Sequence, residues 1–176
     1  IRQQKLRQIK LYSYAIGKEK GRSDFQHFRE YPAYSGLQQR DTPFTDTEGQ
    51  LETIRVKQTT LDRIIKPTQA IRLIKIDIEG GELHALMGAT AIIQQARPII
   101  IFENGNQASA RTYNYSRDDF FDFFDAMQLS VYTLDGTHFT REHWHKAPYC
   151  WEYYALPNEA AHLAQEMPIF AQKTID

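Results

Sequence analysis

The sequence contains a single cysteine, Cys150, so it can form neither a disulfide within the chain nor a zinc site of several cysteines. It has no apolar run of the roughly 18–20 residues that a membrane-spanning helix requires, and no signal-peptide pattern. Its formal net charge of −1 argues against a general nucleic-acid or membrane-surface binder, because such proteins carry basic patches. These absences predict a cytoplasmic globular protein with no nucleic-acid partner and no membrane span.

Hydrophobic runs and turn residues divide the 176 residues into alternating strands and helices, enough for one domain with a single core. The pattern predicts strands at residues 9–16, 23–28, 53–58, 71–78, 99–102, 130–134 and 151–156. It predicts helices that begin near Leu61, Leu83 and Ser116, and a closing helix at residues 159–167. The polar stretch 18–50 is expected to form long loops around the strand at 23–28.

The middle of the chain indicates the class of fold. Residues 71–78 and 99–102 are almost continuously aliphatic, which is typical of strands buried on both faces of a parallel sheet. Strands and helices alternate from there onward, with Ser116 and Asp119 spaced as a helix capping box. This order predicts an α/β fold with right-handed crossovers and a mainly parallel sheet.

Three carboxylates mark the most informative segment. Asp77 ends the strand at 71–78, and Glu79 and Glu82 follow it around the Gly80-Gly81 pair. Ligands of open α/β sheets bind beyond the carboxyl ends of the strands, where a carboxylate can accept a substrate proton or hold a ligand or cation. The alternative is that these carboxylates only cap the next helix, and the spacing alone leaves both open.

Other polar residues are weaker candidates. Glu103 and Asn104 end the strand at 99–102 and are expected to face the same cleft, although Asn-Gly is also a turn signal. His84 lies just inside the following helix and is a candidate for the same cleft. The histidine-rich loop, whose histidines are His138, His143 and His145, lacks a completing carboxylate or cysteine, which favours surface and packing histidines over a metal site.

Three segments together resemble the FkbM-type methyltransferase family: TLDRII at 60–65, IRLIKIDIEGGELHALMGA at 71–89 and RPIIIFE at 97–103. The resemblance implies a Rossmann-like class I methyltransferase, a three-layer sandwich around a mainly parallel seven-stranded sheet. Its last strand is antiparallel, and residues 151–156 fit that strand at or near an edge of the sheet. It implies methyl transfer from S-adenosylmethionine to a hydroxyl group of a small molecule or glycan, such as a sugar or natural product.

The resemblance also assigns roles to residues. Asp77 is expected to be the general base or the carboxylate that binds the acceptor. The full set is Asp77, Glu79 and Glu103 as catalytic residues, Glu82, His84 and Asn104 as substrate-binding residues, and Ala15 and Ile16 beside the cofactor, with no metal ligand.

The chain departs from the family in one respect. It has no G-x-G-x-x-G sequence, and the family's glycine-rich cofactor loop is expected before residue 1. We therefore expect residues 1–176 to be one methyltransferase domain truncated at its N-terminus, with N-terminal strands missing, and inactive alone. Two alternatives remain: a cation-dependent hydrolase or sugar transferase that uses Asp77, Glu79 and Glu82, and a non-catalytic Rossmann-like module.

Overall fold

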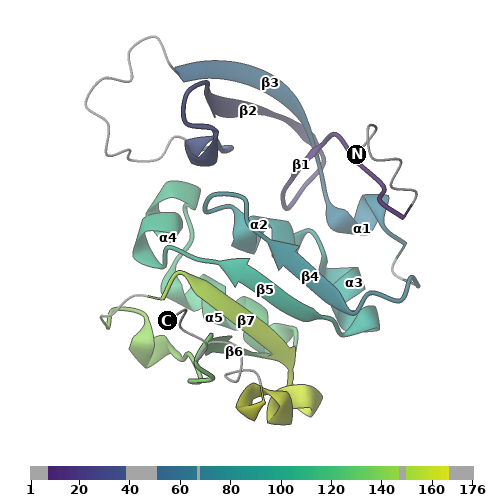
Figure 1. Ribbon diagram of the computed structural model, residues 1–176, viewed down its shortest axis with the longest axis vertical. Coiled ribbons are helices and arrows are strands. Elements are labelled where there is room, and N and C mark those ends of the chain that lie inside the picture. Colours follow the sequence, from purple (N-terminus) through teal and green to yellow (C-terminus); the bar gives the residue numbers. More distant parts are fainter. Residues whose placement is uncertain (1–7, 39–50, 67, 147–149, 167–176) are drawn as a thin grey trace, which may run out of the picture.

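The computed structural model describes residues 8–38, 51–66, 68–146 and 150–166 (Figure 1). Its strands are β1 (Ala15–Ile16), β2 (Gly21–Phe28), β3 (Leu51–Thr59), β4 (Leu73–Ile76), β5 (Ile99–Glu103), β6 (Leu129–Thr133) and β7 (Glu152–Pro157). Its α-helices are α1 (Leu61–Ile64), α2 (Glu82–Met87), α3 (Thr90–Ala96), α4 (Gln107–Tyr113) and α5 (Arg117–Ala126). Three 3₁₀ helices are η1 (Pro32–Tyr34), η2 (Arg141–His143) and η3 (Asn158–Gln165). None of the described helices is long and apolar enough to cross a membrane.

The strands form two sheets. The first has the order β1-β3-β2, with β1 parallel and β2 antiparallel to β3. The second has the order β4-β5-β7-β6. In it β4 and β5 are parallel, whereas β7 is antiparallel to both of its neighbours, so β4, β5 and β6 all run in one direction. The predicted α/β class, the parallel pair β4–β5 and the antiparallel β7, one strand in from an edge, are confirmed. The expectation of one mainly parallel sheet is wrong for the described residues: the strands form two mixed sheets, because β2 returns as a hairpin-like partner of β3 and β7 lies antiparallel between β5 and β6.

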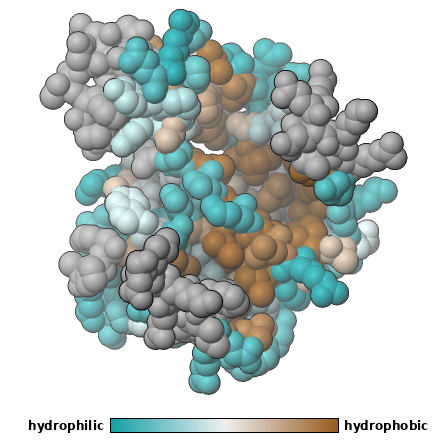
Figure 2. Space-filling model, viewed as in Figure 1, coloured by the Kyte–Doolittle hydropathy of each residue, from teal (hydrophilic) through white to brown (hydrophobic). Residues whose placement is uncertain are grey.

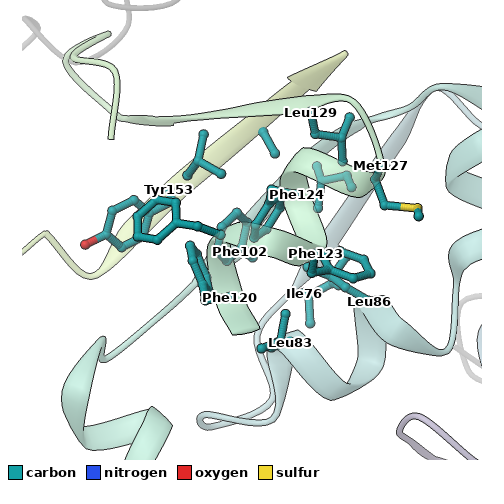
Figure 3. Packing of buried hydrophobic residues seen from close by; sticks show 14 of the residues in the cluster. Ile76, Leu83, Leu86, Phe102, Phe120, Phe123, Phe124, Met127, Leu129 and Tyr153 are labelled. Atoms are coloured by element: carbon teal, nitrogen blue, oxygen red, sulfur yellow. The ribbon is translucent and has the colours of Figure 1, made fainter. Parts of the chain in front are cut away.

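The main core lies on the face of the second sheet that α2, α3 and α5 cover (Figures 1 and 3). Along β5, Ile100 and Phe102 point into it, and Phe102 stacks on Phe124 of α5 and Tyr153 of β7 at 5.5 and 5.8 Å between ring centroids. Burial of each such side chain stabilises the fold by about 1.5–3 kcal/mol. The predicted capping box at Ser116 and Asp119 is present at the start of α5. The phenylalanines of this helix are buried in the core.

On the other face of the second sheet, β4 is more exposed than the sequence predicted. Residues 71–78 were expected to be buried on both faces, but Leu73 is 55% exposed and Lys75 is also exposed. The reason is that β4 is the end strand of its sheet, and α2, α3 and α5 lie on the opposite face. On this face η3 covers β7, where Tyr154 and Leu156 are buried. Figure 2 shows the hydrophobic surface that remains on this side of the molecule.

Three other predictions needed adjustment. The expected strand at 9–16 is reduced to β1, and the closing helix is the 3₁₀ helix η3, with residue 167 outside the described residues. The helix expected to begin near Leu83 is divided into α2 and α3 at Gly88, where a Cβ atom would overlap the carbonyl oxygen of Gly17. The Asp62 carboxylate accepts hydrogen bonds from the first backbone N–H groups of α3 at 2.9 and 3.0 Å, which makes this restart favourable.

Candidate active site

The chain between β4 and α2 forms a tight turn in which two successive residues have positive φ. Glu79 has a φ of 62° and Gly80 a φ of 102°, and Gly81 then occupies the N-cap position of α2 without a side-chain cap. The turn follows directly on β4, so Asp77 and Glu79 lie beyond the carboxyl end of that strand. The sequence placed both carboxylates there, and the structure confirms that position.

Glu82 holds this turn from the inside. Its side chain is 2% exposed, and its Oε1 accepts hydrogen bonds from the backbone N–H groups of Ile78 at 3.0 Å and Gly80 at 3.1 Å. Burial raises the pKa of Glu82, the nearby Glu103 carboxylate raises it further, and the hydrogen bonds that it accepts act in the opposite direction. Glu82 therefore fixes the shape of the turn. Unlike Asp77 and Glu79, it does not line the cavity beside this turn.

Gly80 is required at this turn for two reasons. Its positive φ is costly for any residue with a Cβ atom, and a Cβ built there would lie 2.9 Å from the Tyr113 ring. We expect Gly80→Ala to lower the free energy of unfolding by about 1–3 kcal/mol in urea titrations. Gly21→Ala is the matched control, because its Cβ would meet no atom within 4 Å and its φ is ordinary. Equal stability of the two variants would contradict this account of the turn.

A cavity of about 380 Å³ lies between this turn and the first sheet, and we call it the carboxylate cavity. Asp77 and Glu79 line it from the turn, and Ala15 and Ile16 line it from β1. Most of the remaining wall is apolar or aromatic and consists of Tyr14, Phe25, Pro32, Leu37, Ile78 and Tyr113, with Ser35, Gly36 and Gly81. The structure thus brings together two predicted catalytic carboxylates and the two residues predicted to border the cofactor.

Asp77 makes one ion pair and keeps one oxygen available. Its Oδ2 accepts a hydrogen bond from Lys75 Nζ at 3.0 Å, and both side chains are about half exposed. This hydrogen bond raises the pKa of Lys75, with the charges of Asp77 and Glu103 adding to it against the effect of burial. Within the described part of the chain, no backbone N–H donates to Asp77, so its carboxylate does not cap α2.

Glu103 lies at the same edge of the sheet as Asp77 but does not line the carboxylate cavity. In the parallel pair β4–β5, Ile76 is opposite Phe102, so Asp77 and Glu103 follow at neighbouring strand ends, as predicted. The charge of Glu103 influences the pKa values of both Lys75 and Glu82. However, Glu103 is not among the residues that line the carboxylate cavity, so its catalytic role stays a prediction.

A second cavity of about 320 Å³ adjoins the first, and we call it the tryptophan cavity. Glu79 and Tyr113 line both cavities, whereas Arg111 and Trp151 line only the second. Trp151 is 57% exposed, and Arg111 has no carboxylate partner among the described residues. The sequence did not single out either residue for function: α4, which carries Arg111, was not predicted, and Trp151 was assigned only to a strand.

Two of the residues predicted to bind substrate, Asn104 and His84, have partners within the protein, and their role stays a prediction. Asn104 is buried, and its Oδ1 accepts hydrogen bonds from the backbone N–H of Asn106 at 3.0 Å and from the Tyr115 hydroxyl at 3.1 Å. His84 is half-buried with its ring edge-on to Tyr113, and burial together with the charge of Lys18 lowers its pKa. Neither lines the carboxylate or the tryptophan cavity, although Asn104 borders a further hollow beside Trp151.

The histidines of the loop near the last strand have separate neighbours. His143 Nδ1 contacts Thr140, His145 Nδ1 lies 2.6 Å from Gln107 Nε2, and the ring of His138 packs on Tyr132. Among the described residues, no group of three histidine, cysteine or acidic side chains has a geometry that could hold a metal ion. The Asp77, Glu79 and Glu82 set of the cation-dependent alternative is therefore not assembled, because Glu82 faces the backbone of the turn.

The three segments that resemble the FkbM family, at 60–65, 71–89 and 97–103, lie within the match to a family model. The family model of the methyltransferase FkbM domain matches residues 1–143. No curated protein matches the chain significantly. The chain is similar to the crystal structure of methyltransferase FkbM from Methylobacillus flagellatus KT, with a TM-score of 0.43 and 20% sequence identity. That match covers 88% of this chain and 31% of the other, so the chain spans less than a third of that protein's length.

Proposed function

Because this chain belongs to the FkbM methyltransferase family, we propose that it forms the catalytic and acceptor-binding part of an enzyme that transfers a methyl group from S-adenosylmethionine to a hydroxyl group. The observation that carries the proposal is the carboxylate cavity, where Asp77 and Glu79 meet Ala15 and Ile16. It lies beyond the carboxyl end of β4, where open α/β sheets bind their ligands.

The residues of this cavity fit the cofactor. S-adenosylmethionine supplies an electrophilic methyl group on a positively charged sulfur. The Glu79 carboxylate suits that charge, and the rings of Tyr14, Phe25 and Tyr113 suit both a cation and a flat heterocycle. The short side chain of Ala15 leaves room for the adenosine moiety at β1, where we place it.

Asp77 is the proposed general base. Its Oδ2 is held by Lys75, which orients the carboxylate and compensates its charge. Its Oδ1 takes part in no hydrogen bond that the described residues make, so it can accept the proton of an acceptor hydroxyl. Glu79 is proposed to orient the acceptor, because it lies where the carboxylate and tryptophan cavities meet.

The tryptophan cavity is the proposed entrance for the acceptor. The exposed indole of Trp151 offers a flat apolar surface, and Arg111 and Thr112 offer hydrogen-bond donors beside it. A sugar or other polyhydroxylated ring presents apolar faces and a hydroxyl-rich edge, which matches this combination. The acceptor hydroxyl would then reach Asp77 past Glu79.

We further propose that the remaining strands of the Rossmann-like sheet, with the glycine-rich cofactor loop, belong to a segment preceding Ile1. Support comes from β4, which ends its sheet and leaves Leu73 more than half exposed. A strand paired with β4, and helices over the exposed face, would bury this apolar surface. The 176-residue chain alone is then expected to bind S-adenosylmethionine weakly and to be inactive, which the DNA sequence upstream of Ile1 and calorimetry would test.

The test of the function is methyl transfer by the natural protein that carries this chain. The protein is incubated with S-adenosylmethionine labelled in its methyl group and a panel of sugars and polyhydroxylated small molecules. We expect label in a product that resists alkaline hydrolysis, as an ether does and an ester does not. Label found only in an ester, an amine or the protein itself would contradict transfer to a hydroxyl group.

A further inference from the structure

A further cavity, which shares Tyr14 with the carboxylate cavity, is lined by basic side chains. Its volume is about 500 Å³. It is lined by residues of β2, β3 and α1, at that end of the three-stranded sheet where β1 pairs with β3 (Figure 1). Four cationic side chains line it and we call them the basic cluster: Lys20, Arg22, Lys57 and Arg63. The cavity has no acidic residue in its described wall. This is unexpected in a chain of net charge −1, with 21 basic and 22 acidic residues.

The register of β2 and β3 makes the cluster energetically unusual. Along one face of this antiparallel pair, Phe28 is opposite Leu51, and Gln26 is opposite Thr53, which donates a hydrogen bond to it at 2.9 Å. The next pair continues the complementarity, because Asp24 faces Arg55 and forms an ion pair at 2.8 Å.

The fourth pair on this face breaks the pattern. Arg22 lies directly opposite Lys57, and like charges in this position destabilise a sheet. Three complementary pairs followed by a repulsive one indicate that the two cations serve a purpose other than stability.

Three acidic residues lie near the cluster in the chain, Glu19, Asp24 and Asp62, and none of them lines the cavity. Asp24 is engaged by Arg55, and the Asp62 carboxylate, although it belongs to α1 beside Arg63, accepts the N–H groups at the start of α3. The positive charge of the basic cluster is therefore left uncompensated by these neighbours.

We propose that the basic cluster binds a phosphate-bearing small molecule with at least two negative charges. The two arginines offer planar groups of N–H donors that match phosphate oxygens, and the two lysines add point charges. The volume falls in the range of small-molecule sites, about 300–1,000 Å³. A concave site within a chain of nearly zero net charge favours a compact anion over a polymer or a membrane surface.

Inorganic pyrophosphate is the probe, and its binding to the natural protein is measured by calorimetry at low and at physiological salt. We expect one site per chain that weakens as salt increases. The double variant Arg22→Gln/Lys57→Gln should bind at least about 10-fold more weakly, because two charge-assisted contacts are lost. Arg55→Gln is the matched control: it removes a cation from the same strand face but outside the cavity, and affinity should stay within about 2-fold.

Lys57→Glu separates binding from folding. It creates an opposite-charge pair with Arg22, so we expect Tm to rise by about 1–4 °C while pyrophosphate binding is lost. A variant that loses both stability and binding would overturn the proposal, as would a wild-type protein that does not bind pyrophosphate. Sedimentation with phosphatidylglycerol vesicles that pyrophosphate does not displace would assign the cluster to a lipid surface instead.

Discussion

Replacing Asp77 by alanine is expected to lower the rate of methyl transfer by about 10²–10⁴-fold, the usual effect of losing a positioned general base. Asp77 lies on the carboxylate cavity with one carboxylate oxygen held by Lys75 and the other available to an acceptor hydroxyl. The rate is measured with labelled S-adenosylmethionine in the natural protein. Binding of S-adenosylmethionine, measured by calorimetry, should change little, because we assign most cofactor contacts to the preceding glycine-rich loop.

Asp24→Ala is the matched control for this experiment. Like Asp77, Asp24 is exposed and forms a single ion pair with a nearby cation, but it lies on β2 away from the carboxylate cavity. It should retain wild-type turnover. An Asp77→Ala enzyme that also keeps wild-type turnover would mean that the carboxylate has no chemical role. Loss of S-adenosylmethionine binding in that variant would instead mean that Asp77 binds the cofactor rather than the acceptor.

Replacing Glu82 by alanine is expected to lower the free energy of unfolding by about 2–4 kcal/mol, since two partly buried N–H groups lose their acceptor. These are the backbone groups of Ile78 and Gly80, which Glu82 Oε1 binds. Activity should fall as well, because the turn that carries Asp77 and Glu79 loses its support. Urea titration measures the stability, and the transfer assay measures the activity.

Glu82→Gln tests whether the hydrogen bonds or the charge matter. The amide oxygen can still accept both N–H groups, so most of the stability should remain. Burial raises the pKa of Glu82, so its contribution to stability is complete below the unfolded pKa of 4.5 and is lost as the pH rises through the folded pKa. Titrations from pH 4 to 8 should show this decline in the wild type and not in Glu82→Gln. The same decline in both proteins would contradict the assignment.

The main lines of the fold could be predicted because they depend on local patterns. Continuous aliphatic runs gave β4 and β5, and Ser116 with Asp119 gave the start of α5. The break at Gly88 could not be predicted, because it depends on a close approach to Gly17, 71 positions away in the chain (88 − 17). The exposure of Leu73 was also missed, since an aliphatic run does not reveal whether both faces of a strand are covered.

The candidate site, like the fold, could be predicted only where it depends on local sequence patterns. Position at a strand end was sufficient to place Asp77, Glu79 and Glu103 at one edge of the sheet, since the carboxyl ends of parallel strands meet there. The sequence could not distinguish Glu79, which lines a cavity, from Glu82, three residues later, which is turned into the protein. Trp151 was missed as a site residue because its neighbours on the tryptophan cavity come from the turn after β4 and from α4.

A crystal structure of the natural protein with S-adenosylhomocysteine tests the central claim most directly. The claim is that donor and acceptor meet in the cavity where β1 faces the turn after β4. The account predicts the adenosine moiety beside Ala15 and Ile16, with the sulfur directed toward Asp77. A ligand bound at the basic cluster or in the tryptophan cavity, with the carboxylate cavity filled by protein side chains, would contradict it.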